Sequence, residues 1–275
     1  MSILDKFKLA WYSSYKVAKF RETFSALLPK KHPTKIIFLF GCQRSGTTIL
    51  QKIISLNPNV KFHGEGDSPY FYDSDTEKHH RLIPTNEVNQ LIQKEHLKLI
   101  TLKPLYESHF ANKLIANYPN SKGIWVFRDY NEVIDSHIRY YKQNAIDYIK
   151  PLYSSETNSW LNESLTEEVI KLISILPLEE LSDADAYGLF WIARNSIFLE
   201  AKDNKNILLI NHRHLVESPE NQITIICDFI GLPAYNFYSK AIHKKNSTKR
   251  LTIQLKPEIQ QACEKIYQQL NNECQ

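Results

Sequence analysis

Residues 41–48, GCQRSGTT, follow a short apolar run and have the spacing of a phosphate-binding loop. Gly41 and Gly46 are separated like the two glycines of the Walker A pattern GxxxxGK[ST], and Thr47 and Thr48 add hydroxyl donors. Glycine permits a sharp turn and a close approach of the backbone to a ligand, and the amides that open the following helix face an anion. The loop therefore predicts a site for a phosphoryl or sulfuryl group.

The loop lacks the lysine that a Walker A loop needs for a nucleoside triphosphate. Thr47 stands in its place, and Arg44 supplies a cation from inside the loop instead. The Walker lysine contacts the β and γ phosphates, and the hydroxyl residue after it holds Mg²⁺. Arg44, Ser45 and the two threonines suit one compact phosphoryl or sulfuryl group better than a triphosphate. For the loop alone, an ordinary glycine turn that caps a helix stays an alternative.

A second candidate anion site lies in WVFRDYNEVIDSHIRYY, residues 125–141. Arg128 ends a predicted strand there, and Ser136 follows on the next predicted helix. The carboxyl ends of the strands line the ligand crevice of an open α/β sheet, so Arg128 faces the same crevice as the glycine loop. A guanidinium group can clamp a phosphate with two parallel hydrogen bonds, and Ser136 comes within reach if the helix begins near Asn131. Because the two anion sites follow in order, we favour a functional pair over a carbonyl-capping arginine beside an exposed serine.

The elements around these residues alternate between strand and helix. Four short apolar runs predict strands buried on both faces, at 35–40, 97–102, 122–127 and 206–211. Helical patterns lie between them and near the C-terminus, at 46–56, 107–118, 131–142, 185–202 and 256–272. We expect a P-loop-type three-layer α/β/α domain with a central, mainly parallel sheet. The region 141–184 has few strand signals and is predicted to be a helical insertion near the site.

The composition is that of an ordinary globular protein, with 275 residues, 43% hydrophobic and 23% charged. No apolar run reaches the length of a membrane span, and the N-terminus has no signal-peptide pattern. The four cysteines are scattered without a CxxC pair, which favours a reducing compartment, the cytoplasm by default, and no structural zinc. The histidine pairs 79–80 and 212/214 have no carboxylate or cysteine at metal-ligand spacing, so no metal is expected.

The first 34 residues are predicted to form a separate basic, aromatic-rich helical segment ahead of a domain at 35–275. Residues 1–35 hold eight basic and two acidic residues, although the whole chain carries only +4. Such a helix can lie on an anionic membrane surface through residues 1–31, or it can pack on the domain with its lysines in water. Nucleic acid is not an expected partner, because nothing beyond this segment resembles a basic face.

Taken together, these motifs resemble those of the sulfotransferases that use 3′-phosphoadenosine 5′-phosphosulfate (PAPS). In that family a loop like RSGTT holds the 5′-phosphosulfate, and an arginine followed eight residues later by a serine holds the 3′-phosphate. Both are present, the second as Arg128 and Ser136, and residues 101–129 and 206–233 are also similar to the family. Tyr130 departs from the family's usual proline without removing a ligand group. The resemblance implies that the loop binds the nucleotide through Gly41, Gln43, Arg44, Ser45, Gly46, Thr47 and Thr48, with PAP as the product and no metal required.

The resemblance also suggests which groups do the chemistry. Transfer to a hydroxyl needs a base for the acceptor's proton and stabilisation of the moving charge. In VKFHGEGDSPYF (60–71), Glu65 is our first choice as base and His63 the second, with a surface turn as the alternative for Glu65. Lys103, in TLKP, resembles a family lysine that neutralises charge at the sulfuryl group. The alternative is that Lys103 only ends a strand, with its side chain in water. Arg44 is expected to stabilise the bridging oxygen as PAP leaves.

The stretch HKKNSTKRL (243–251) resembles the family's flexible loop over the nucleotide. Lys249 or Arg250 is expected to reach the 3′-phosphate, and a solvated charge run is the alternative. The acceptor is open among a carbohydrate, a lipid headgroup, a small alcohol or phenol, and a tyrosyl peptide. Two rival functions stay open as well: a divergent P-loop kinase of a small metabolite, and a nucleotide-binding module without turnover.

Overall fold

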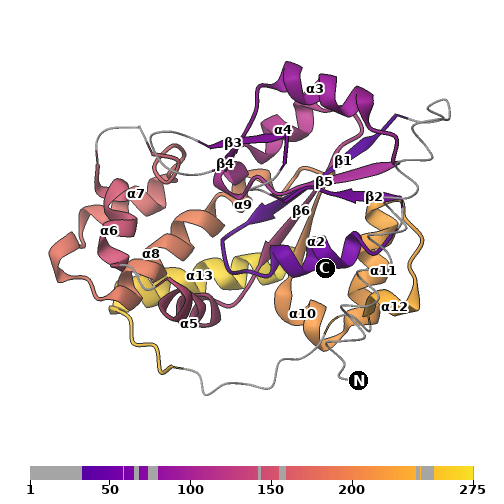
Figure 1. Ribbon diagram of the computed structural model, residues 1–275. Coiled ribbons are helices and arrows are strands. Elements are labelled where there is room, and N and C mark those ends of the chain that lie inside the picture. The colour runs from indigo at the N-terminus through magenta and orange to yellow at the C-terminus, as the bar shows by residue number, and fades with distance from the viewer. Residues whose placement is uncertain are drawn as a thin grey trace.

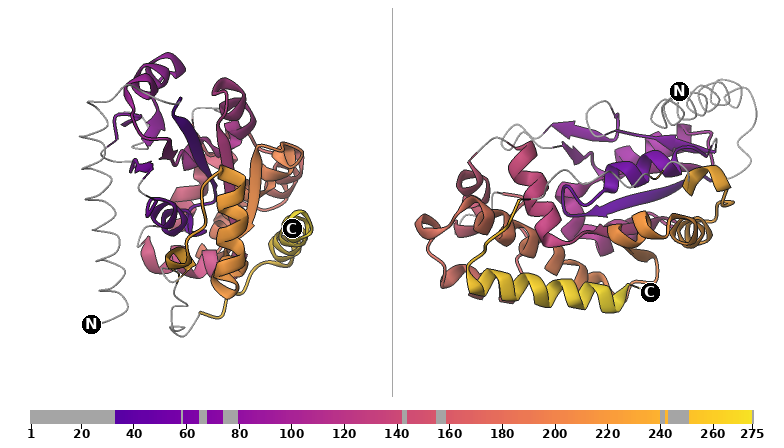
Figure 2. Two further views of the ribbon diagram at one scale, coloured as in Figure 1. Left: turned by 90° about the vertical axis from the view of Figure 1, so that its right-hand side faces the viewer. Right: turned by 90° about the horizontal axis from the view of Figure 1, so that it is seen from below.

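The computed structural model describes residues 33–57, 59–64, 68–73, 80–141, 144–154, 159–239, 242 and 251–274 (Figures 1 and 2). The basic segment predicted at 1–34 lies almost entirely outside these residues, so the predicted division of the chain and its predicted membrane contact stay predictions. None of the described helices is both long and apolar enough to cross a bilayer.

Five parallel strands form the central sheet in the order β2–β5–β1–β6–β7. Their bounds are β1 Lys35–Gly41, β2 Val60–Phe62, β5 Leu99–Leu102, β6 Lys122–Phe127 and β7 Ile207–Asn211. β1, β5, β6 and β7 are the four apolar runs of the sequence. The predicted α/β class with a mainly parallel sheet is therefore confirmed.

The sheet separates two hydrophobic cores, because successive side chains of a strand point to opposite faces. Ile37 and Leu39 of β1 belong to the core under α2 (Thr47–Ile54) and α11 (Pro219–Ile230). Phe38 of the same strand belongs to the core under α8 (Asp183–Ser196) and α13 (Pro257–Glu273). Figure 2 shows α2, in indigo, and α13, in yellow, on opposite sides of the sheet.

The remaining helices connect the strands or cover the edges of the sheet. Those before the insertion are α3 Thr85–Lys94, the 3₁₀ helix η1 Leu105–Phe110, α4 Ala111–Asn117 and α5 Tyr130–Tyr140. Those after it are α9 Phe198–Ala201, α10 His212–Glu217 and α12 Asn236–Ser239. A small antiparallel pair, β3 Phe71–Asp73 and β4 His80–Leu82, and helix α3 were not predicted.

The predicted insertion at 141–184 is helical in its described parts. It contains α6 Ala145–Ile149, η2 Lys150–Tyr153, α7 Glu167–Ser174 and η3 Leu178–Glu180. Figure 1 shows α6 and α7 beside α8. The ring of Tyr148 in α6 is 6.5 Å from the ring of His137 in α5, so the insertion packs directly against the helix that carries Ser136.

Candidate active site

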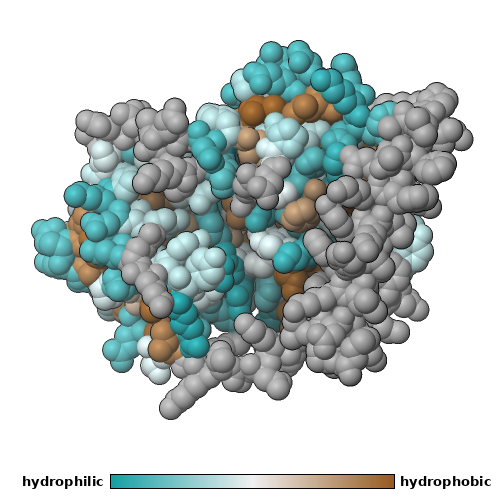
Figure 3. All heavy atoms as spheres, in the orientation of Figure 1, coloured by the Kyte–Doolittle hydropathy of each residue, from teal (hydrophilic) through white to brown (hydrophobic). Residues whose placement is uncertain are grey.

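The predicted site residues that the structure describes gather at one edge of the sheet. The glycine loop begins at the last residue of β1, Lys103 follows β5 and Arg128 follows β6. His212, which was not a predicted site residue, follows β7. In parallel strands these carboxyl ends share an edge, where ligands bind in open α/β sheets. The face in Figure 3 is hollowed near its middle, between the lobe of α5 to α8 and the start of α2.

The two loop glycines are required by geometry. Gly41 has φ 132°, and a Cβ placed on it would lie 2.3 Å from the carbonyl oxygen of Val126. Gly46 has φ 98°, and its Cβ would lie 2.3 Å from Cδ2 of His212. Both φ values are in the region that glycine alone adopts readily. The loop therefore lies so close to β6 at Gly41, and to the ring of His212 at Gly46, that neither position has room for a methyl group.

A buried serine holds the first glycine in place. The amide of Gly41 donates to Oγ of Ser108 at 3.2 Å, and that hydroxyl donates to the carbonyl of Leu105 at 2.9 Å. Nη2 of Arg194, which is fully buried in α8, donates to the same carbonyl at 2.7 Å. The start of the loop is thus tied to the turn that follows Lys103.

Arg44 reaches from the loop to helix α5. Its Nε donates to Oγ of Ser136 at 3.1 Å, and its Cζ lies 4.0 Å from the centre of the Tyr140 ring. Its carbonyl accepts a hydrogen bond of 3.3 Å from Nη1 of Arg128. Arg44, Arg128 and Ser136, which the sequence placed in two separate motifs, are therefore one cluster.

Arg128 lies at the junction of β6 and α5. Its Nε pairs with Oε2 of Glu132 at 2.7 Å, and its carbonyl accepts from Nε1 of Trp191 at 3.0 Å. The side chain of Asp129 caps α5 by accepting from the amide of Glu132. Tyr130, where the family commonly has proline, begins the helix and packs its ring 5.8 Å from that of Trp191. The departure thus adds a core contact and leaves Arg128 in place.

Lys103 brings a cation to the start of α2. Its Nζ donates to Oγ1 of Thr48 at 2.9 Å, although Lys103 is only 9% exposed. The loop lacks the lysine of a Walker A loop, and a lysine that follows the neighbouring strand β5 thus brings a positive charge to it. Sequence spacing could not show this, because 55 residues separate the two groups.

Three further loop side chains face inward. Gln43, Ser45 and Thr47 are buried, and within the part of the chain that the structure describes the side chains of Gln43 and Ser45 have no hydrogen-bond partner. The backbone amide of Ser45 donates to the carbonyl of Cys42 at 3.3 Å and closes a turn. The side chains of Gln43, Ser45 and Thr47 are therefore part of the interior of the loop and not of its exposed surface.

The two histidines nearest the loop are uncharged at neutral pH. Burial, helped by the nearby charge of Arg44, lowers the pKa of His137 to about 3. Burial and then the charge of Arg128 lower the pKa of His212 to about 4. The positive charge of the cluster therefore comes from its arginines.

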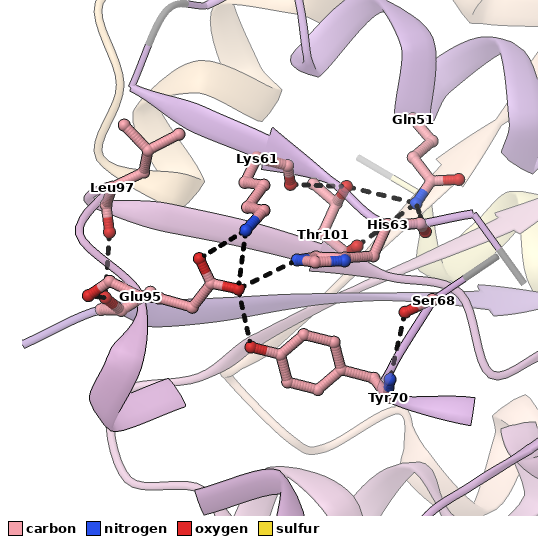
Figure 4. A network of polar contacts seen from close by, with 9 residues as sticks. Gln51, Lys61, His63, Ser68, Tyr70, Glu95, Leu97 and Thr101 are labelled. Atoms are coloured by element: carbon pink, nitrogen blue, oxygen red, sulfur yellow. Dashed lines mark hydrogen bonds and ion pairs between the residues drawn. The ribbon is translucent and has the colours of Figure 1, made fainter. Parts of the chain in front are cut away.

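His63 lies at the end of β2 in a buried polar network (Figure 4). Its Nε2 is 3.2 Å from Oε1 of Glu95, which also accepts from Tyr70 at 3.0 Å, while Oε2 of Glu95 pairs with Lys61 at 2.9 Å. Burial alone would raise the pKa of Glu95, but the hydrogen bonds and charges of His63 and Lys61 lower it to about 2. His63 is therefore held by a carboxylate, and its role as a base stays a prediction.

Gln51 connects this network to the loop's helix. Its side-chain nitrogen donates to the carbonyl of His63 at 3.0 Å and to the carbonyl of Thr101 at 3.3 Å. Figure 4 shows it bridging from above to the ends of β2 and β5. Helix α2 is thereby fastened to the strands that lead to His63 and Lys103.

Three predicted site residues, Glu65, Lys249 and Arg250, lie outside the described residues, and their roles stay predictions. Sequence reasoning missed Ser108, Tyr140, Glu95 and the packing of His212 on Gly46. Tyr140 follows Ser136 by four residues, about one helical turn, and this spacing could have marked it. Ser108, Glu95 and His212 stand at no recognisable spacing from the motifs they support, so no sequence signal marked them. Among the residues that the structure describes, no group of three or more His, Cys, Asp or Glu side chains could hold a metal ion.

The chain belongs to the sulfotransferase domain family, whose model matches residues 34–272. The fold is similar to that of the sulfotransferase domain from the curacin biosynthetic pathway, with a TM-score of 0.50 and 15% identity over 85% of this chain and 98% of that one. The sulfotransferase domain of the Synechococcus PCC 7002 olefin synthase matches with a TM-score of 0.48 and 17% identity, over 87% and 96% of the two chains. A sulfotransferase from Alicyclobacillus acidocaldarius matches with a TM-score of 0.45 and 14% identity, over 86% of this chain and 92% of that one. No curated protein sequence matches this chain.

Proposed function

We propose that this sulfotransferase moves a sulfuryl group from PAPS to an acceptor hydroxyl. The observation that carries the proposal is the meeting of the two predicted anion-binding elements at one edge of the sheet. The glycine loop with Lys103 provides one, and Arg128 with Ser136 provides the other, joined through the hydrogen bond between Arg44 and Ser136. PAPS carries an anionic group at each of two positions, the 5′-phosphosulfate and the 3′-phosphate, and so matches this pair.

The groups of the chain then have distinct tasks. The amides at the start of α2 and the hydroxyl of Thr48 hold the 5′-phosphosulfate, where the helix dipole favours an anion. Lys103, bonded to Thr48, stabilises charge on the group in transfer. Glu65 is proposed to take the acceptor's proton, with His63 as the second candidate. The acceptor oxygen bonds to sulfur while the bond from sulfur to the bridging oxygen breaks, and PAP leaves with that oxygen.

A thermal melt of the purified protein tests the donor class. We would measure it with PAP, with 5′-AMP, and with ATP plus Mg²⁺. A ligand at about a hundred times its dissociation constant adds about 2.7 kcal/mol of stability, a shift of about 5–10 °C for a domain of this size. We expect the full shift with PAP and none with ATP and Mg²⁺. A shift with ATP and Mg²⁺ alone would replace the proposal with a kinase.

Substitution of Arg128 tests the second anion site. We expect Arg128→Ala to weaken PAP by about tenfold or more, because a charged hydrogen bond to phosphate is lost, and to leave 5′-AMP nearly unchanged. Isothermal titration with both ligands measures this.

Arg213→Ala is the matched control, since Arg213 also pairs through Nε with a glutamate four residues later but is 68% exposed. Equal losses for PAP and 5′-AMP in Arg128→Ala would remove Arg128 from the 3′-phosphate site.

A further inference from the structure

We propose that Arg194, in the last turn of α8, is a positioning residue for sulfuryl transfer. It holds the turn that carries Lys103, and together with Ser108 it fixes that turn to the first glycine of the loop. This inference rests on the proposed use of PAPS and on the proposed place of Lys103 beside the group in transfer. It gives a buried residue behind the site a role in how the site holds its donor.

Lys103 is followed by a tight turn. The amide of Leu105 donates to the carbonyl of Lys103 at 2.9 Å, and Pro104 between them has φ −79° and ψ 66°. These angles are those of an inverse γ-turn, and the proline ring restricts φ to this region. The direction in which the backbone presents Lys103 to Thr48 is therefore coupled to the position of Leu105.

The carbonyl of Leu105 is held by two donors. Nη2 of Arg194 donates to it at 2.7 Å, and Oγ of Ser108 donates to it at 2.9 Å. The same hydroxyl oxygen accepts from the amide of Gly41 at 3.2 Å. One carbonyl group thus connects the turn after β5 to helix α8 directly and to the loop after β1 through Ser108. Loss of either donor would loosen the turn relative to the loop.

Arg194 lies where a cation is costly. The residue is 1% exposed, and burial lowers the pKa of its guanidinium group to about 10, so the group stays charged at neutral pH. Among the described residues its one hydrogen bond is the bond to Leu105, and Nε has no partner. An apolar side chain of similar volume often stabilises such a buried place more than a charge does. The stability of the fold therefore does not explain an arginine at this position, whereas its hold on Leu105 does.

The insertion keeps the guanidinium group in this position. Cζ of Arg194 lies 4.8 Å from the centre of the Trp160 ring, and the ring of Tyr106 packs edge-on against Trp160 at 4.7 Å. Tyr106 comes directly after Leu105 in the chain. The ring contacts and the hydrogen bond therefore hold the same short segment from the side of α8 and the insertion.

The carboxylate that could compete for Arg194 is already paired. Glu163 is the carboxylate whose charge acts on Arg194, but it pairs with Arg81 at 2.7 Å and with His109 at 2.8 Å. The guanidinium group of Arg194 is therefore directed to the carbonyl of Leu105 and not to a salt bridge.

The test compares PAPS with PAP, which differ in the sulfuryl group beside which Lys103 is proposed to lie. We expect Lys103→Ala to weaken the binding of PAPS by about tenfold and that of PAP by less than about threefold. Arg194→Met keeps an apolar contact with Trp160 but loses the donor, and it should weaken PAPS by about fivefold or more and PAP by less than about threefold. Arg194→Lys keeps a donor and should lose less than Arg194→Met. Isothermal titration with both nucleotides measures each affinity.

Ser108→Ala tests the same connection if Arg194→Met does not fold, because it removes the other donor to Leu105. We expect it to weaken PAPS more than PAP. Ser182→Ala is the matched control, since it removes the N-cap of α8 and leaves the contacts of Leu105 intact. It should change neither affinity, and melts without ligand verify that each variant is folded.

A double variant decides whether Arg194 acts through Lys103. If it does, Arg194→Met should weaken PAPS by less than about twofold once Lys103→Ala is present. An undiminished loss in that background, equal losses for PAPS and PAP, or an Arg194→Lys variant as weak as Arg194→Met would overturn the assignment and leave the proposed function intact. Failure of the unsubstituted protein to bind either PAPS or PAP would refute the proposed function and this inference together.

Discussion

At the scale of single residues, the loop requires glycine at two positions for two different reasons. Gly41 is required because the carbonyl of Val126 approaches it, and Gly46 because a histidine ring does. The first neighbour is backbone and cannot move independently, whereas the second is a side chain that a substitution can remove. The difference can be measured.

We predict that Gly46→Ala lowers the free energy of unfolding by about 1–3 kcal/mol and abolishes the stabilisation by PAP. The added methyl group would overlap Cδ2 of His212, and the φ of 98° would be strained as well. Gly231→Ala separates the two causes, because Gly231 has φ 72° but nothing lies within 4 Å of the place its methyl group would take. Thermal melts with and without PAP measure both effects.

The double variant Gly46→Ala with His212→Ala should recover part of the lost stability, since it removes the overlap and keeps the strain. Two results would show that the ring of His212 does not limit this position. One is that the double variant recovers none of the lost stability. The other is that Gly46→Ala alone loses no more stability than Gly231→Ala.

At the scale of secondary-structure elements, one carboxylate connects the start of α8 to the start of α13. Asp185 and Ser182 form a capping box in which each side chain bonds the other residue's amide. The second oxygen of Asp185 also accepts from the amide of Lys256 at 2.7 Å, immediately before α13. The cap therefore joins two helices across 71 residues of the sequence.

We predict that Ser182→Ala costs about 1 kcal/mol of stability, the usual loss of an N-cap. Asp185→Ala should cost about 2 kcal/mol or more, because the amide of Lys256 also loses its partner in a partly buried place. Urea unfolding of the two variants measures the difference. Equal costs would mean that the bond to Lys256 contributes nothing to stability.

Elements with a strong pattern were predicted, and those that depend on distant contacts were not. The runs of β1, β5, β6 and β7 are apolar on both faces, which is the pattern of buried parallel strands. The helix expected at 107–118 begins instead as the 3₁₀ helix η1 and becomes α4 at Ala111. The pair β3–β4 has only three residues in each strand, too few for alternation to be recognised.

At the scale of the whole molecule, the network around Glu95 fastens β2, α2 and β5 together. Thr34, just before β1, also donates to the carbonyls of Glu95 and Leu97. One ionised carboxylate is thus a common partner of His63, Lys61 and Tyr70 (Figure 4). Protonation of this carboxylate should therefore lower the free energy of unfolding of the whole domain.

We predict that stability falls as the pH drops from about 4.5 to about 2. The pKa of Glu95 is lowered from 4.5 to about 2 in the folded protein, so its contribution is complete above pH 4.5 and disappears as the folded carboxylate takes up a proton. The shift corresponds to about 3 kcal/mol at most. Unfolding by urea across this pH range measures the slope.

Glu95→Gln should be less stable at pH 7 and should show a flatter dependence on pH below 4.5. Substitution of the exposed Glu258 by Gln is the control. An unchanged slope in Glu95→Gln would assign the acid sensitivity to other groups.

The sequence by itself determined the fold class and the family, and it predicted the glycine loop and the pair Arg128 and Ser136 as anion sites, because these depend on local spacing and on hydrophobic runs. Only the tertiary structure decided how these parts meet. It brought Lys103 to Thr48, Arg44 to Ser136 and Glu95 to His63, each across 32 or more residues. The physical reason is that the direction of a side chain depends on the φ of its own residue and on the elements packed around it. A linear pattern records which groups are available, and the packing of the sheet against its helices decides which of them touch.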